Sequence, residues 1–326
     1  MKKRIKLLCL ALPVLINLHV FGQTTTLPAP FGSHPWTATV KVIGEDGNPI
    51  TGADVDVSYD FLSASGQSGK GKSWDEIRGL TDTTGMFSVS HTDTATDLGI
   101  TGKKSGYYTT HIGYQFYFDE KKWHPTFTLL LKKIGKPIPL YVKRLKAQVP
   151  ILDKPVGFDL MAGDWVAPYG KGIKTDIIFN AQTEKRSEFD WDSKLTVSFP
   201  NPGDGIQEFN APVLLQDAPM GQSDLRSSHE APAEDYQPQW VQTISCRPHR
   251  GGYSGNRDPN HNYFIRVQTV LDENGNVKSA LYGKIYGDFM DFSYYLNPAP
   301  NDRNVEFEPK HNLLGGLQSL EQVSAP

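Results

Sequence analysis

The stretch VKVIGEDGNPITGADVDV, residues 40–57, carries the clearest fold signal in this chain. Both of its ends alternate apolar and polar residues, which is the two-residue period of a strand with one buried face. Between them, EDGNP at 45–49 carries the Asp, Gly and Asn residues that tight turns need. The stretch and its flanks therefore predict two strands joined by a turn, with the following side chains buried: Ala38, Val40, Val42, Ala53, Val55, Val57 and Tyr59.

The same alternation recurs along the rest of the chain. KLTVSF at 194–199, NYFIRVQTV at 262–270 and NVEFE at 304–308 each place apolar residues on one face, and TDTTG at 81–85 and DENGN at 272–276 supply turns. We find no convincing amphipathic helix longer than two or three turns, and 30 Gly and 23 Pro are spread along the 326 residues. The sequence therefore predicts an all-β protein, and its length suggests two β-sandwich-like domains.

Several pieces of the first half follow one another in a recognisable order. Two strands joined by a Pro-containing turn are followed by the turn and strand GLTDTTGMFSVS at 79–90 and by LGITGKKSGYYT at 98–109. This order resembles the carboxypeptidase regulatory-like domain, a small transthyretin-like or immunoglobulin-like sandwich. The matching residues are Val40, Val42, Asp46, Gly47, Pro49, Gly52, Ala53, Val55, Thr81, Asp82, Gly85, Met86, Phe87, Gly106 and Tyr107. The resemblance covers roughly residues 36–133 and implies an accessory sandwich at 34–133 without catalytic residues of its own.

A basic stretch with several prolines follows this module. Residues 121–150 hold eight Lys or Arg and no acidic residue, and Pro137, Pro139 and Pro150 stiffen the chain. We expect a connector at 134–152, whose charge fits either solvated strand faces or a seam that docks on an acidic surface. A second β-rich domain is then expected at 153–326.

Three blocks of the second half resemble the C-terminal region of secreted bacterial proteins that carry a regulatory-like domain. The blocks are GDWVAPYGKG at 163–172, LDENGNVKSALYGKIYGDF at 271–289 and NPAPNDRNVEFEPK at 297–310. That region has no assigned activity, so the resemblance implies architecture only. In its last block, Val305 and Phe307 alternate with Glu306 and Glu308, which predicts a final strand completing the second sandwich.

The N-terminus has the form of a secretory signal peptide at residues 1–23. Four basic residues precede an uncharged apolar run that is shorter than the ~20 residues of a membrane-spanning helix. Its removal would leave 29 basic and 36 acidic residues, a charge of −7, which does not favour nucleic acid or an anionic membrane as partner. It would also leave Cys246 as the single cysteine, which we expect to be buried and inert. The predicted location is outside the cell, in the periplasm or at the cell envelope, without stable membrane insertion.

The octapeptide GQSGKGKS at 66–73 matches the phosphate-binding pattern G-x-x-x-x-G-K-[ST]. Such a loop needs a buried parallel strand before it and a long helix after it. Here the preceding strand carries Asp54 and Asp56, and WDEIRGLTD at 74–82 is too short for that helix. We therefore predict a flexible loop and no nucleotide.

No catalytic or metal-binding motif is intact. CRPHRGG at 246–252 lacks the Arg six residues after Cys that a phosphatase loop needs, and no His pair has the spacing of a zinc site. DPNHN at 258–262 and DENGN hold oxygen ligands but do not follow the EF-hand pattern. We predict no cofactor and no metal. The one enzymatic alternative is an acid/base pair of a polysaccharide hydrolase, drawn from Asp190, Asp192, Asp288 and Asp291.

Aromatic residues are dense in the second half, and in GKIYGDFMDFSYYL both alternating faces carry rings. Either two sheets bury both faces, or one face is an exposed strip that stacks on sugars or docks a protein. The candidate binding residues are Trp191, Tyr286, Tyr294 and Tyr295. The absence of an intact catalytic motif favours a secreted, non-catalytic binding or scaffolding protein, with a glycan or an envelope protein as partner.

Overall fold

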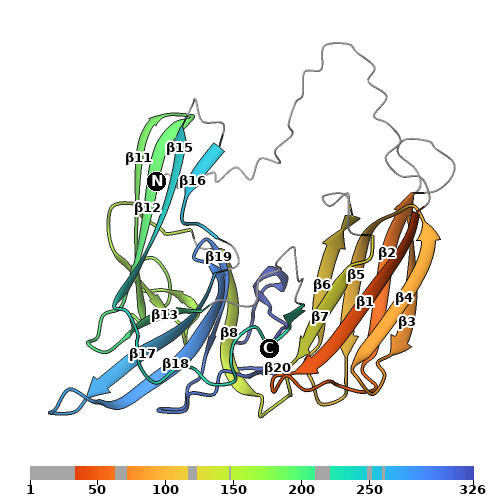
Figure 1. The fold of residues 1–326 in the computed structure, drawn as a ribbon. Helices are drawn as coiled ribbons and strands as arrows, with labels where there is room; N and C mark the ends of the chain where they lie inside the picture. The colour runs from red at the N-terminus through yellow and green to blue at the C-terminus, as the bar shows by residue number, and fades with distance from the viewer. Residues whose placement is uncertain are drawn as a thin grey trace.

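A computed structural model describes residues 34–62, 72–116, 123–146, 148–209, 221–247, 252–258 and 261–326 (Figure 1). Across these residues the regular structure is β, apart from 3-10 geometry at Phe116 and a 3-10 turn at Ser319–Glu321, so the all-β prediction is confirmed. The predicted signal peptide and residues 66–71 of the octapeptide lie outside the described residues. Lys72–Leu80, at the end of the octapeptide, is a strand and not the helix that a phosphate loop requires. Within the part described, no helix has the length and apolar character to span a membrane.

The first sandwich consists of two sheets that face each other (Figure 1). One sheet has the order β4(Met86–Asp93)-β1(His34–Gly44)-β7(Thr126–Leu131). The other has the order β14(Gln222–Ser223)-β6(Thr110–Gln115)-β5(Ala95–Lys103)-β2(Asp54–Leu62)-β3(Lys72–Leu80). The side chains predicted to face inward on β1 and before and along β2 are all buried in the core between these sheets. The strand prediction from residues 40–57 is therefore confirmed.

Gly85 shows why the turn at 81–85 needs a glycine. Its φ is +76°, a region that other residues rarely adopt. A Cβ atom at this position would lie 2.6 Å from the carbonyl oxygen of Val42 and 2.9 Å from Cβ of Pro49. The backbone of this turn can therefore approach the first turn closely, and Val42 N–H donates to the Gly85 carbonyl at 2.8 Å.

The second sandwich pairs two six-stranded sheets. One has the order β10(Asp164–Trp165)-β9(Val156–Asp159)-β11(Ile177–Ser187)-β12(Asp190–Ser198)-β15(Gln239–Arg247)-β16(Gly252–Gly255). The other has the order β13(Gly205–Phe209)-β17(Asn262–Leu271)-β18(Val277–Asp288)-β19(Asp291–Leu296)-β8(Ile138–Lys146)-β20(Phe307–Asn312). Rings fill the space between them, among them Phe158, Phe179, Tyr263, Phe289 and Tyr294.

Residues 138–146 differ from the expected connector. They form β8, which lies between β19 and β20, and Leu140 and Val142 are fully buried. The pairing with β19 begins at Tyr141, so Pro139, which cannot donate a backbone hydrogen bond, precedes that ladder. The prolines therefore mark the start of a strand here, and most of the predicted connector belongs to the second sandwich.

The second half of the chain also contributes a strand to the first sandwich, within what we call the exchanged segment, residues 222–226. Residues 222–223, expected in the second domain, form β14 and pair with His111 and Thr110 of β6. Gly221 N–H donates to Thr128 O at 2.8 Å, and Asp224 N–H donates to Thr109 O at 2.9 Å. The sheet of the first sandwich is thus completed by a segment that comes much later in the chain, and the boundaries 34–133 and 153–326 do not describe this part of the fold.

One end of the β11-β12-β15-β16 sheet extends beyond the sandwich, at the upper left of Figure 1. We call this end the arm and define it as residues 182–194, 243–247 and 252–255. None of its described side chains is buried, and residues 182–189 are all exposed. The arm therefore has no core of its own, and its conformation depends on cross-strand contacts.

Candidate functional site

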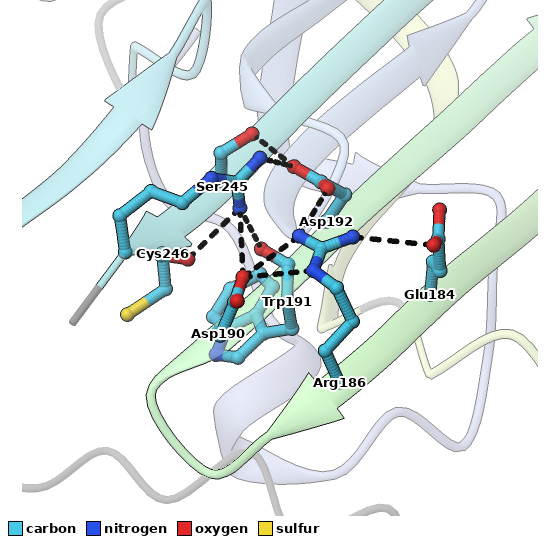
Figure 2. A network of polar contacts seen from close by, with 8 residues as sticks. Glu184, Arg186, Asp190, Trp191, Asp192, Ser245 and Cys246 are labelled. Carbon is cyan, nitrogen blue, oxygen red and sulfur yellow. Dashed lines mark hydrogen bonds and ion pairs between the residues drawn. The ribbon is translucent and has the colours of Figure 1, made fainter.

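Two aspartates and two arginines form a network at the tip of the arm (Figure 2). Arg186 donates to Asp190 Oδ1 at 2.9 Å through Nε and to Asp192 Oδ2 at 2.6 Å through Nη2. Arg247 Nη2 and Ser245 Oγ each donate to Asp192 Oδ1 at 2.6 Å. Charge-assisted bonds of this length are the strong class of hydrogen bond. The network therefore ties β11, β12 and β15 together where no core supports them.

A β-bulge brings Arg186 to this position. The pairing of β11 with β12 shifts between Lys185, which faces Trp191, and Ser187, which faces Asp190. Arg186 is the extra residue, without a partner of its own on β12. From this position its guanidinium bridges both aspartates of the next strand and also contacts Glu184 at 3.2 Å.

The network keeps both aspartates ionised. The hydrogen bond from Arg186 lowers the pKa of Asp190, and those from Ser245, Arg186 and Arg247 lower the pKa of Asp192 well below its usual range. A general acid of a glycosidase needs a raised pKa so that it holds a proton near neutral pH. The structure brings Asp190 and Asp192 together as predicted, but the pair is suited to holding the arm and not to donating a proton.

Aromatic side chains lie beside this network. Trp191 faces Cys246 on β15, which in turn faces Tyr253 on β16, so the three residues form a row across the strands. The Trp191 and Tyr253 ring centroids are 5.9 Å apart, and Tyr253 is 74% exposed. Phe189, in the turn between β11 and β12, is 64% exposed. Cys246 is half-buried and not buried as expected.

Sequence reasoning identified Trp191 but did not select Phe189 or Tyr253 as binding residues. For Phe189 there was a signal, because a large apolar side chain in the polar turn RSEFD has no core to enter. For Tyr253 there was no signal beyond its presence among many aromatic residues, since Trp191, whose ring it contacts, lies more than sixty positions earlier.

Tyr286, Tyr294 and Tyr295 do not form the exposed aromatic strip that was one of the two alternatives from the sequence. Their side chains are at most 6% exposed. Tyr294 faces the sandwich core and donates to Leu160 O at 2.9 Å, whereas Tyr295 faces the other side and donates to Ala325 O at 3.2 Å. Both faces of β18 and β19 are covered, one by the opposite sheet and the other by residues outside the strands that include Ala231, Val305 and Val323. Of the two alternatives drawn from the sequence, burial on both faces is the one observed.

Asp288 and Asp291 are held in the same way as the aspartates of the arm. Arg144 donates to both carboxylate oxygens of Asp291 at 2.9 Å, which lowers the pKa of that carboxyl. Asp288 is almost fully buried, accepts from Arg257 Nε at 2.6 Å and from Met290 N–H at 2.8 Å, and caps the turn between β18 and β19. Neither carboxylate is positioned as a free acid or base.

Among the residues described, no group of three or more His, Cys, Asp or Glu is arranged to hold a metal ion.

Comparison with known proteins gives only distant likenesses. No protein-family model matches the sequence, and the search of curated proteins finds no match. Among solved structures, 3-chlorocatechol 1,2-dioxygenase from Rhodococcus opacus 1CP is 12% identical with a TM-score of 0.24, and the match covers 32% of this chain and 62% of that chain. The chain thus spans about three fifths of the dioxygenase.

Two pilins match over a longer part of the chain. Shaft pilin SpaA from Lactobacillus rhamnosus GG is 10% identical with a TM-score of 0.21, over 84% of this chain and 95% of that chain. The Streptococcal ancillary pilin is 10% identical with a TM-score of 0.21, over 81% of this chain and 59% of that chain. At these TM-scores the likenesses carry no conclusion on function, which has to come from the site itself.

Proposed function

We propose that this is a secreted, non-catalytic binding protein of the cell envelope or exterior, and that the arm is its glycan-binding surface. The observation that carries the proposal is the row of Trp191 and the exposed Tyr253 next to arginines and aspartates that satisfy one another. Aromatic faces supply stacking area for a sugar ring, and the carboxylates of the network have lone pairs left that accept hydrogen bonds from its hydroxyl groups.

The same network argues against hydrolysis. A retaining or inverting glycosidase needs one carboxyl that is protonated near neutral pH and one that is free to act as nucleophile or base. On the arm, the pKa of both carboxyls is lowered by hydrogen bonds, and both accept from arginine. The arrangement supports binding without turnover.

The position of the arm also supports a role in binding. It protrudes from the second sandwich and lacks a core, and ion pairs connect its strands. A preorganised surface loses less entropy when it binds a ligand than a flexible one does. An exposed aromatic surface on strands that are cross-linked by ion pairs is therefore the form expected of a recognition site.

The test is a pull-down of the purified protein with a panel of envelope and plant polysaccharides, with reducing ends measured in the same samples. We expect retention on one class of polysaccharide, no reducing-end release, and at least about tenfold weaker binding for Trp191→Ala and Tyr253→Ala, which each lose a stacking ring. Trp74→Ala is the matched control, because Trp74 is 69% exposed on β3 of the first sandwich. Sugar release by the wild-type protein that Asp192→Asn abolishes would establish the hydrolase instead, and retention unaffected by either arm variant would refute the arm as the binding surface.

A further inference from the structure

A cavity of about 900 Å³ lies between the two sandwiches. It is lined by β6 of the first sandwich, by β8, β18 and β19 of the second, by the exchanged segment 222–226, and by residues 322–325. Its volume is within the range of sites that enclose a small ligand, and clefts between domains are common places for such sites. No residue of the arm lines it, so a ligand in this cavity would be independent of the function proposed for the arm.

Three arginines line this cavity, and two of them are occupied by aspartates. Arg144 forms a two-bond pair with Asp291, and Arg257 pairs with Asp288 at 2.6 Å. Arg226 forms no ion pair among the described residues. Its guanidinium lies over the Tyr286 ring at 5.2 Å from the centroid, which orients it without neutralising its charge. Of these three arginines, Arg226 is therefore the one available to an anion.

Arg226 belongs to a polar row on the exchanged segment. Gly221, Ser223 and Leu225 are buried, whereas Gln222, Asp224 and Arg226 alternate with them and all three line the cavity. In an extended chain, alternate residues share a face and lie about 6.5–7 Å apart. The segment thus presents an amide, a carboxylate and a guanidinium in line along one wall.

We infer that this cavity binds a uronate, meaning a sugar ring that carries a carboxylate. The carboxylate pairs with the fork of Arg226, which matches its two oxygens, and ring hydroxyl groups donate to Asp224 and exchange hydrogen bonds with Gln222. Asp224 and Arg226 lie two residues apart on one face of the segment, so an acceptor for hydroxyl groups and a partner for a carboxylate stand along the same wall. An amino acid fits less well, because its two charged groups are attached to the same carbon.

The test is calorimetric titration of the full chain with galacturonate and with di- and trigalacturonate, beside the corresponding neutral galactosides. We expect saturable binding of the uronates and binding at least about tenfold weaker for the neutral sugars, because these lack the charge-assisted pair. Comparing the affinities for the monosaccharide and for the oligosaccharides distinguishes a free sugar acid from a residue within an acidic polysaccharide.

Variants assign the binding to the cavity. Arg226→Gln should weaken uronate binding at least about tenfold, and Arg226→Lys less, because the charge remains without the fork. Arg78→Gln is the matched control, since it removes the same charge from a 63% exposed side chain on β3, and it should leave the dissociation constant within about twofold. Asp224→Asn, on a 37% exposed side chain, provides a second cavity variant that does not disturb the core.

Variants distinguish uronate binding in the cavity from polysaccharide binding by the arm. Trp191→Ala should leave uronate binding unchanged even though it weakens polysaccharide binding by the arm. No uronate binding, equal binding of uronates and neutral sugars, binding of an acidic peptide in their place, or uronate binding that both Arg226→Gln and Asp224→Asn leave unchanged would each overturn the inference.

Discussion

Glu306 shows how one residue can join the two sandwiches. Its side chain is 1% exposed, and its carboxylate accepts from Tyr108 Oη at 2.6 Å and from the backbone N–H groups of Gly135 and Lys136 at 2.7 Å each. Burial opposes its ionisation, but these hydrogen bonds outweigh burial and lower its pKa. Tyr108 lies in the first sandwich, so this carboxylate is a direct polar link between the halves.

Glu306→Gln should lower the free energy of unfolding by about 2–4 kcal/mol, because the amide replaces a charged acceptor and places a donor opposite donors. Urea unfolding measures this, and Glu308→Gln on the same segment is the control, which should change the free energy of unfolding by less than about 0.5 kcal/mol.

The folded-state pKa of Glu306 is below its unfolded value. Its contribution to stability is therefore present above the unfolded pKa, near 4.3, and is lost as the pH falls through the folded pKa. The variant should therefore lose less stability than the wild type on acidification below about pH 4.5. Equal pH profiles would contradict this role.

Lys284 is fully buried between two tyrosine rings. Its Nζ lies 4.8 Å from the centroids of both Tyr286 and Tyr295, and burial lowers its pKa well below the usual value. The folded protein thus binds this proton less tightly than the unfolded chain does, so stability rises as the pH increases toward the unfolded pKa of about 10.4.

Lys284→Met should raise the free energy of unfolding at neutral pH by on the order of 1–3 kcal/mol, because an apolar side chain of similar length avoids the desolvation cost. Lys278→Met, on the exposed end of the same strand, is the control and should change it by less than about 0.5 kcal/mol. The free energy of unfolding is measured by denaturation at pH 7 and pH 9.5. Destabilisation by Lys284→Met at both pH values would mean that the contacts with the rings outweigh burial of the charge.

At the level of strands and turns, alternation predicted strands well and their surroundings poorly. The alternation around residues 40–57 gave the correct buried face because turn chemistry and periodicity agree there. In NVEFE the same pattern correctly buries Val305 and Phe307 but places Glu306 in solvent, although the first sandwich covers it. Periodicity states which residues share a face and not what packs against that face. For the same reason it could not show that β18 and β19 are covered on both sides.

The final strand provides a test at this level. Phe307 is fully buried, begins β20 beside β8, and packs on Tyr295 with ring centroids 5.8 Å apart. Phe307→Ala should lower the free energy of unfolding by about 3–5 kcal/mol, as expected for a lost core aromatic, and truncation before Asn301 should cost at least as much. Leu313 is 42% exposed, so Leu313→Ala should lower the free energy of unfolding far less. A truncated chain with unchanged thermal stability would show that β20 is an appendage.

Across the molecule, the sequence predicted two sandwiches but not that a strand of the second half joins the first sandwich. The prolines near 137–139 suggested a connector, whereas β8 is an interior strand, and nothing local marks Gln222–Ser223 as the edge strand of a sheet that begins about 170 residues earlier. The network on the arm was hidden in the same way, because Arg247 is 55 residues from Asp192. Long-range pairing of this kind leaves no periodic signal in the segments that form it.

Cleavage therefore should not separate the halves. β8 is held between β19 and β20, and β14 is held on β6, so a chain cut between residues 148 and 153 should remain one particle. Limited proteolysis followed by native size-exclusion chromatography and denaturing electrophoresis measures this. Two fragments that co-elute at the size of the intact chain are expected, and fragments that elute separately and stay folded would show that the halves are independent domains.

Recognition of a glycan by the arm can be tested by hydrogen–deuterium exchange of the full chain, with and without the polysaccharide that the pull-down retains most strongly. We predict slower exchange of backbone amides at 186–194 and 243–247, because bound sugar covers these strands and restrains the network. Trp191→Ala should abolish the effect. Protection confined to other segments, or unchanged exchange at saturating polysaccharide, would contradict glycan recognition by the arm.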